Sequence, residues 1–395
     1  HPYSVIAPTV ESLEATTRET LVEFHRSKFV PNNAVLVVAG DVESDALLKQ
    51  IERLFGGWTK GESSTDDFPA PPKRTARSAY LVDRPGSAQS NIVISNTGIT
   101  RTSPDYFPML LMHTVLGANA SSRLFMNLRE DKGYTYGAYS SLDGRRTAGS
   151  FRVTAEVRTA VTGPSLKEFF AELERIRKEP VSEKEIADAK SYLTGIFPIR
   201  LETQEGLIEQ LVQTKMLCLP DNYLETYRQK IQDVTVKEIQ RVAQEYVRPD
   251  EAAIVIVGDG AEILEQVKPY TDTIEMYNTA GKRKGPRSAT ATNPDSMVGT
   301  WSLDIETPFG QNIPATLTLT SGASGMGGTV TSPMGDAEIM SARLDGNDFR
   351  CKMSFNMGGQ TLDAQIAGEI DGDQIEGSIS MHDSPPIPFQ GSKTA

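Results

Sequence analysis

Cysteine and positive charge are scarce in this 395-residue chain. Cys218 and Cys351 are its two cysteines, and thiols so far apart in the sequence argue against a disulfide framework or a cysteine-based metal site. Lys and Arg number 40 against 52 Asp and Glu, for a formal charge of −12. This balance argues against a nucleic-acid partner, because phosphate neutralisation needs clustered cations. No apolar run approaches the roughly 20 residues of a membrane helix, so we expect no transmembrane segment.

Histidine is scarce as well, and its spacing is uninformative for metal binding. The chain has His1, His25, His113 and His382. None forms a His-x-x-Glu-His motif, which would place two imidazoles on one helix face with Glu as general base. We interpret His25 and His113 as structural residues, and we expect no metal site within these residues.

An internal repeat is the strongest pattern that is present. Residues Thr17–Phe55 and Thr235–Val267 share a capped amphipathic helix, a proline turn, an apolar run and a Gly-Asp step into another helix. Thr17, Pro31 and Gly40 each recur 218 positions later. Because the helix cap, the proline turn and the Gly-Asp step all keep the same offset, the two segments indicate an internal duplication. The apolar run Ala34–Ala39 predicts a strand covered on both faces.

The two copies have unequal surroundings. The second ends a module that begins near Ala79, whereas only a few residues precede the first. By symmetry we expect a stretch of roughly 150 residues upstream of His1, and hence an N-terminally truncated chain.

The remaining patterns divide the chain into an α+β part and an all-β part. Ala79–Val82, Ser90–Ser95 and Gly149–Val157 alternate like strands, and Ser182 opens a capping box for a helix. From Gly299 onward, short alternating runs separated by Asp-Gly turns predict a β-barrel or sandwich. We therefore predict an α+β fold with an antiparallel-rich sheet and packed helices. Its parts are the end of a truncated first domain (1–70), a second domain (71–275), a solvated linker with the basic run Lys282–Arg287 (276–295) and an all-β accessory domain (296–395).

Several motifs in combination resemble the pitrilysin/insulinase family of metallopeptidases, which includes bacterial zinc peptidases and mitochondrial processing peptidase subunits. The resemblance is to the second, zinc-free domain and runs from the start of the chain to about residue 275. The matching motifs are His1-Pro2-Tyr3, Val30–Ala34, Val38–Val42, Gln89–Ile92, Leu116–Leu124 and Leu128–Tyr136.

The resemblance assigns roles to residues of this chain. By position, Arg129 and Tyr136 match the family's Arg and Tyr that reach the substrate peptide beside the zinc of the first domain. A guanidinium and a phenol can hydrogen-bond a peptide carbonyl and stabilise the oxyanion formed there. The loop containing Gly117, Asn119, Ser121 and Ser122 is expected to line the same cavity and contact substrate. The alternative is that Arg129 merely pairs with Glu130 and that Tyr136 packs at the start of a strand.

The implied function is that of the non-zinc half of a zinc peptidase, which binds and positions a peptide or an unfolded polypeptide. Zinc is then expected in the missing domain or in a catalytic partner subunit, and a homo-oligomer is also possible. The alternative is a catalytically silent scaffold or assembly subunit of the same fold. A third hypothesis makes the β domain a carbohydrate, surface or protein adhesion module with contacts from Trp301, Phe355 and Phe389, although aromatic residues of this kind usually fill a core. The weak similarity of this domain to the β-barrel tails of exported bacterial proteins suggests a periplasmic or extracytoplasmic location.

Overall fold

The computed structural model describes the chain except residues 1, 6, 63–67, 280, 285–296, 307–311, 323–324, 334, 346–347, 358–359, 382–385 and 395. It divides into two compact units. Unit 1 holds residues 1–78, 92–157 and 164–254, and unit 2 holds residues 79–91, 158–163 and 255–395. The second unit therefore combines the β-rich C-terminal part with segments from the helical part.

The N-terminal residues form short elements with little burial. These are η1 (Pro2–Ser4), α1 (Val10–Glu14), α2 (Arg18–Lys28), η2 (Pro31–Asn33) and α3 (Ser44–Phe55). Thr17 caps α2 by accepting a hydrogen bond from the backbone N–H of Thr20. No residue of α1, α2 or α3 is buried.

The repeat is visible in the helices and turns. Helix α10 (Val236–Tyr246) and turn η5 (Pro249–Glu251) have the bounds of α2 and η2 shifted by 218 residues. The strands differ. The second copy forms the half-buried strand β5 (Ala253–Gly258), whereas the expected strand at Ala34–Ala39 is wrong: these residues form no strand, and Leu36 is 61% exposed. A strand needs a neighbour for its backbone groups, and none of the described residues pairs with this run.

A six-stranded mixed sheet runs through the middle of the chain. Its strands are β1 (Ser78–Asp83), β2 (Gln89–Gly98), β3 (Thr135–Asp143), β4 (Gly149–Arg158), β5 and β6 (Ile274–Tyr277), in the order β3-β4-β2-β5-β1-β6. β1 and β6 pair in parallel, while β3 and β4 pair antiparallel. Among the described strands, β3 is therefore an edge strand that pairs with β4 alone.

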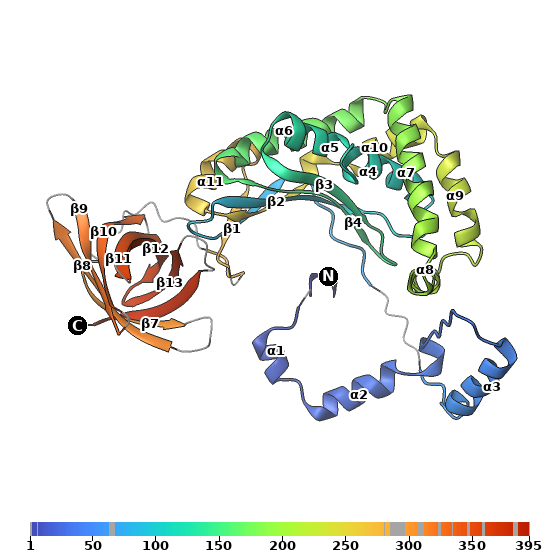
Figure 1. The fold of residues 1–395 in the computed structure, drawn as a ribbon, viewed down its shortest axis with the longest axis horizontal. Helices are drawn as coiled ribbons and strands as arrows, with labels where there is room; N and C mark the ends of the chain where they lie inside the picture. Colours follow the sequence, from blue (N-terminus) through green and yellow to red (C-terminus); the bar gives the residue numbers. More distant parts are fainter. Residues whose placement is uncertain are drawn as a thin grey trace. The chain divides into compact units, whose positions relative to one another are not determined.

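Helices lie against one face of this sheet (Figure 1). In α6 the buried residues Leu166, Phe169, Leu173 and Ile176 recur at helical spacing, and Ser182 forms the predicted capping box of α7. None of the described helices is both long and apolar enough to cross a membrane. The remaining helices are α4 (Tyr106–Gly117), α5 (Arg123–Phe125), η3 (Met126–Asp131), η4 (Thr159–Val161), α6 (Thr162–Lys178), α7 (Glu183–Leu201), α8 (Gln204–Met216), α9 (Tyr223–Asp233), α11 (Gly260–Val267) and η6 (Lys268–Tyr270).

The C-terminal strands form a closed antiparallel barrel in which β14 pairs with β7. The strands are β7 (Gly299–Glu306), β8 (Asn312–Gly322), β9 (Gly325–Ser332), β10 (Gly335–Asp345), β11 (Asp348–Met357), β12 (Gln360–Asp371), β13 (Gln374–Met381) and β14 (Ile387–Thr394). The barrel and the mixed sheet with its helices confirm the predicted α+β class with a β domain.

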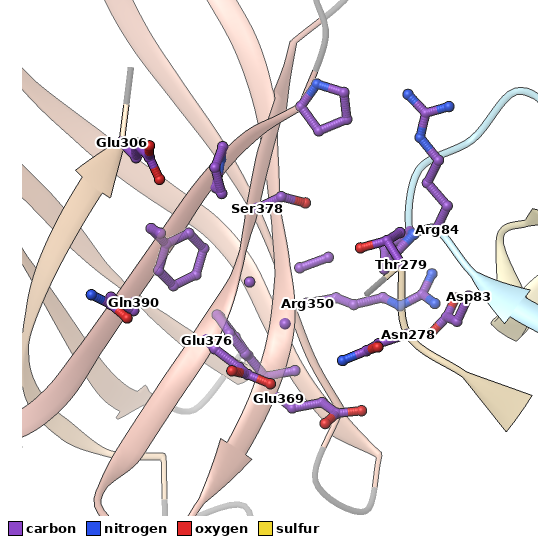
Figure 2. Close-up of a pocket in the computed structure, with 18 of the residues that line it drawn as sticks. Asp83, Arg84, Asn278, Thr279, Glu306, Arg350, Glu369, Glu376, Ser378 and Gln390 are labelled. Atoms are coloured by element: carbon purple, nitrogen blue, oxygen red, sulfur yellow. The ribbon is translucent and has the colours of Figure 1, made fainter. Parts of the chain in front are cut away.

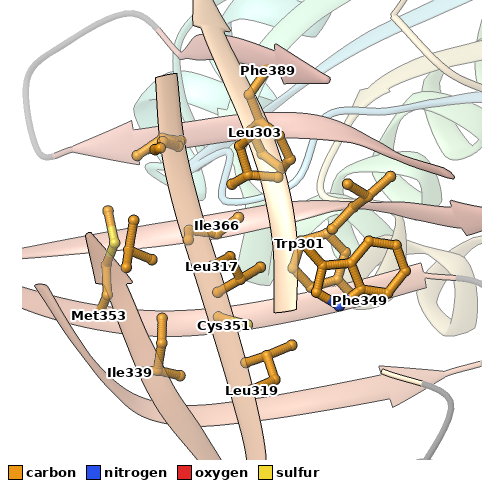
Figure 3. Packing of buried hydrophobic residues seen from close by; sticks show 14 of the residues in the cluster. Trp301, Leu303, Leu317, Leu319, Ile339, Phe349, Cys351, Met353, Ile366 and Phe389 are labelled. Carbon is orange, nitrogen blue, oxygen red and sulfur yellow. The ribbon is translucent and has the colours of Figure 1, made fainter. Parts of the chain in front are cut away.

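The barrel interior is filled by its own side chains (Figure 3). Trp301 and Phe349 are fully buried, and Phe389 is 4% exposed. Eight strands enclose a space that side chains just fill. The suggestion that Trp301 and Phe389 offer surface contacts is therefore wrong, because both rings are used in the core; the side chain of Phe355 lies outside the described residues.

Candidate functional site

Arg129 lies in a short irregular helix. Residues Met126–Asp131 form a π-helix directly after α5. Such wide turns are rare and occur frequently at functional sites. The turn ends at Gly133, whose φ of 63° lies in the left-handed region that favours glycine.

Two neighbours hold the Arg129 side chain. Its Nη1 donates a hydrogen bond to Glu130 Oε1 at 2.6 Å, and its guanidinium lies 5.0 Å from the centre of the Phe125 ring. The side chains of Arg129 and Glu130 are 43% and 47% exposed. A pair this exposed contributes about 0–1 kcal/mol. The ion pair of the alternative interpretation is thus present, yet it is weak enough for a ligand to replace.

Tyr136 lies in a β-bulge at the start of β3. Thr135 pairs with Val157 and Ala138 pairs with Ala155, so β3 has one residue more than β4 between these pairs. Tyr136 is 89% exposed. Bulges occur at sheet edges and next to active sites, where they re-aim a side chain. Tyr136 therefore does not pack at the strand start as the alternative interpretation required.

A chain of ring contacts connects Arg129 to the bulge. Phe125, which supports Arg129, lies 5.9 Å from Tyr139 between ring centres. A Cβ atom on Gly137 would lie 2.6 Å from the Tyr139 ring, so this ring lies directly over the glycine that follows Tyr136. Met126, Tyr136 and Tyr139 are 48%, 89% and 44% exposed. These side chains belong to the contacting elements η3 and β3, and Met, Tyr and Arg are residue types enriched at binding surfaces. We call residues Phe125, Met126, Arg129, Tyr136 and Tyr139 the β3-edge surface.

The loop before α5 is closed by its own hydrogen bonds. Asn119 Oδ1 accepts hydrogen bonds from the backbone N–H of Ser121 at 3.0 Å and from its hydroxyl at 2.8 Å. Ser122 is 3% exposed and donates through its hydroxyl to the Asn119 carbonyl at 2.6 Å. A Cβ on Gly117 would lie 2.4 Å from Ser140 N. These contacts give the loop a structural role, and its contact with substrate stays a prediction.

The described histidines do not suit a zinc ion. His113 Nδ1 lies 2.7 Å from Ser140 Oγ, and burial lowers the pKa of His113 to about 4. His25 stacks on Phe29 with a ring-centre distance of 4.9 Å. His1 and His382 lie outside the described residues. Among the described residues, no group of three or more His, Cys, Asp or Glu side chains can hold a metal ion.

A polar hollow of about 530 Å³ lies within unit 2 and is lined by none of the residues predicted as the site (Figure 2). Lys284 Nζ lies 3.1 Å from Asp83 Oδ2 and 2.6 Å from Glu369 Oε1. Arg350 Nη1 lies 2.9 Å from Asp259 Oδ1. Asp83 and Asp259 are both 4% exposed, so these cations compensate buried carboxylates. The prediction that Lys282–Arg287 is a solvated basic run is wrong for Lys284, because its side chain is only 16% exposed and forms an ion pair.

Residues 15–193 match the family model described as the peptidase M16 inactive domain. This part of the chain is a peptidase M16 inactive domain. The resemblance inferred from the sequence motifs is therefore confirmed, and the match includes Arg129, Tyr136 and the rest of the β3-edge surface.

Relatives of this chain carry the names of zinc proteases and of a non-peptidase homolog. An uncharacterized zinc protease of Streptomyces coelicolor is 27% identical over 241 residues, which are 60% of this chain and 52% of that protein. A Helicobacter pylori protein named a non-peptidase homolog is 23% identical over 64% of this chain and 58% of its own length. The chain thus spans about half the length of these curated relatives.

A solved structure supports the M16 fold. The crystal structure of a peptidase M16 inactive domain from Pseudomonas fluorescens matches with a TM-score of 0.58 and 25% identity, over 63% of this chain and 59% of that one.

The sequence pointed to Arg129 and Tyr136 but missed the residues that place them. Phe125, Thr135 and Tyr139 carry no recognisable chemical motif. The spacing of Tyr136 and Tyr139 carried a signal. They lie three residues apart, and a regular strand would place their side chains on opposite faces of the sheet.

Proposed function

We propose that this chain is the substrate-binding, non-zinc half of a zinc-dependent peptidase. Arg129 and Tyr136 would bind the peptide carbonyl, and the zinc would come from another domain of the same polypeptide or from a partner subunit. The observation that carries the proposal is that two backbone irregularities, a π-helix and a β-bulge, coincide with these two residues. The zinc-protease name of the Streptomyces coelicolor relative supports the same class.

The geometry also suits an extended peptide. β3 has one neighbour in the sheet, and an edge strand can pair with an added strand through main-chain hydrogen bonds. Arg129 has donors besides the Nη1 that Glu130 uses. A guanidinium and a phenol in elements beside this edge support the proposal that they bind a carbonyl of the peptide, and the loop with Gly117, Asn119, Ser121 and Ser122 would contribute to the same site.

The test uses a fluorescently labelled unstructured peptide and its anisotropy on titration with the chain. Arg129→Ala is expected to weaken binding about tenfold or more, since a hydrogen bond to a charged group contributes about 1.5–3 kcal/mol. Tyr136→Phe is expected to weaken it about two- to tenfold, since a neutral hydrogen bond contributes about 0.5–1.5 kcal/mol. Arg145→Ala is the matched control, because Arg145 is 53% exposed and pairs with Asp143 at 2.7 Å, much as Arg129 pairs with Glu130. It should leave binding unchanged. Equal affinity for all four proteins would refute the proposal.

In the complete enzyme, with the zinc-bearing half supplied, Arg129→Ala should lower kcat/KM by about 10²-fold or more, as for removal of one oxyanion-stabilising donor. A catalytically silent scaffold or assembly subunit is the second candidate, and the non-peptidase name of the Helicobacter pylori relative favours it. If the chain is a scaffold, Arg129→Ala should leave kcat/KM unchanged. It should instead alter the mass of the assembly, which size-exclusion chromatography with light scattering measures.

We also propose an extracytoplasmic location, from the weak similarity of the C-terminal β domain to the tails of exported bacterial proteins. Cell fractionation of the producing bacterium tests it, and recovery with the cytoplasmic proteins would refute it.

A further inference from the structure

The bulge in β3 decides to which side Tyr136 points. Ala138 and Ser140 are buried, and the Ser140 hydroxyl donates to the carbonyl of His113 in α4 at 3.0 Å. These side chains therefore face the helices. Side chains two apart in a regular strand share a face, so a regular β3 would turn Tyr136 toward the helices as well. Instead Tyr136 is 89% exposed.

The pairing of β3 with β4 shows where the extra residue lies. Tyr136 and Gly137 together occupy the place opposite Glu156, between the pairs Thr135–Val157 and Ala138–Ala155. Val157 and Ala155 are buried, whereas Glu156 is exposed. The extra residue thus moves Tyr136 to the side of Glu156 and Tyr139, away from α4.

One side chain holds the bulge together. The hydroxyl of Thr135 lies 2.6 Å from the carbonyl oxygen of Glu156 on β4 and 2.9 Å from that of Gly137. The Thr135 hydroxyl oxygen also accepts a hydrogen bond from the backbone N–H of Gly137 at 3.1 Å. The single hydroxyl proton is donated to one of these carbonyls at a time, and the hydroxyl oxygen accepts from the Gly137 amide. The hydroxyl therefore gives partners to backbone groups that the extra residue displaces from the regular ladder.

We propose that Thr135 is a positioning residue whose hydroxyl locks the β3 bulge and thereby turns Tyr136 outward, onto the side of β3 that bears Tyr139. The part of this proposal that concerns peptide binding rests on the proposed function. The part that concerns the direction of Tyr136 does not.

Gly137 and Tyr139 connect the bulge to Arg129. The Tyr139 ring lies over Gly137, where a Cβ would approach it to 2.6 Å. The Tyr139 ring also contacts the ring of Phe125, which in turn lies next to the Arg129 guanidinium. Opening the bulge would shift Gly137 and so disturb the packing that leads to Arg129. The lock thus affects both residues assigned to the substrate.

Thiol labelling measures the direction of residue 136 without any ligand. In a Cys218→Ser, Tyr136→Cys background, the thiol at position 136 is expected to react at the rate of an exposed cysteine. Cys351, which is 2% exposed, is the slow internal reference. Adding Thr135→Val, which keeps the shape and removes the hydroxyl, should slow labelling about tenfold or more because the thiol turns inward. Adding Thr135→Ser should restore the fast rate. Equal rates in all three proteins would overturn the proposal.

Peptide affinity then separates the two proposals. We expect Thr135→Val in the otherwise unchanged chain to weaken peptide binding as much as Tyr136→Ala does, and Thr135→Ser to rescue it. Slow labelling with unchanged affinity would support the lock and refute the proposed function. Fast labelling in Thr135→Val, together with weakened binding in Arg129→Ala, would refute the lock and support the proposed function.

Hydrogen exchange provides a measurement that needs no variant. The Gly137 amide, which donates to Thr135, should be protected from exchange although it lies at a strand edge. Should Thr135→Val fail to fold, a slowly exchanging Gly137 amide in the unmodified chain supports the lock, and one exchanging at the rate of a free amide overturns it.

Discussion

Replacing Arg123 by Ala should destabilise the helical part of the chain more than any surface substitution. Arg123 in α5 donates from Nε to Glu185 Oε1 at 2.6 Å and from Nη2 to Oε2 at 3.0 Å. The side chains are 7% and 29% exposed. Glu185 also accepts from the backbone N–H of Ser182 at 2.8 Å and so takes part in the capping box of α7. One ion pair therefore joins α5, which precedes the Arg129 turn, to a capped helix.

The expected loss follows from burial. Removing one partner of a buried pair costs about 3–5 kcal/mol. Glu185 keeps its contact with Ser182 and is partly reached by water, so the lower end, about 3 kcal/mol, applies here. Glu185→Gln keeps the cap acceptor, and in a double-mutant cycle with Arg123→Ala it isolates the coupling of the pair.

The pH dependence gives an independent check. Burial raises the pKa of Glu185, but hydrogen bonds from Arg123 and Ser182 and the Arg123 charge outweigh it and lower the pKa from 4.5 to about 2. A lowered pKa means that the stabilisation is complete above about 4.5 and is lost as the pH falls toward 2. The stability difference between the wild type and Arg123→Ala should therefore shrink over this range.

The assay is urea unfolding followed by far-ultraviolet circular dichroism, which reports the helices; the described barrel elements are strands. A loss of less than about 1 kcal/mol at neutral pH, the level of an exposed pair, would refute the reasoning. So would a difference that stays constant between neutral pH and about pH 3.

Two further predictions concern the thiols and unit 2. Burial raises the pKa of Cys351 to about 12, so a thiol reagent should modify the exposed Cys218 in the native chain and Cys351 only in denaturant; fast modification of two thiols without denaturant would contradict the buried barrel core. Arg350→Ala should destabilise unit 2 by about 1.5–3 kcal/mol, the range of a hydrogen bond to a charged group, because Asp259, at 4% exposed, loses Arg350 as a cation. The measurement is Trp301 fluorescence in urea in a Trp58→Phe background, because the chain has a second tryptophan. Arg343→Ala is the comparison, since Arg343 is exposed, and an equal midpoint for both variants would refute the role of Arg350.

Local sequence signals determined the helix ends and the barrel strands. Thr17, Ser182 and Thr235 all cap helices as predicted, because a side-chain oxygen and a backbone N–H three residues on meet within one turn. The alternating runs after Gly299 became barrel strands, since period-two burial is a property of the strand itself.

Contacts between distant residues decided the rest. Ala34–Ala39 and Ala252–Val257 are both apolar runs in equivalent positions of the repeat, yet only the second lies largely in a strand, because a strand exists only with a neighbour. Lys284 belongs to a run that looks solvated, but Asp83, about 200 positions earlier, pairs with it. Sequence pattern does not record which distant group will supply the partner.

The candidate site shows the same division. The sequence by itself predicts that Arg129 and Tyr136 carry the chemistry, because residue types and family motif are written in the chain. Only the tertiary structure decided that Tyr136 points outward, since the bulge depends on the pairing of β3 with β4 and on a hydroxyl that bonds across the strands. Register between strands is fixed by contacts that no single segment specifies.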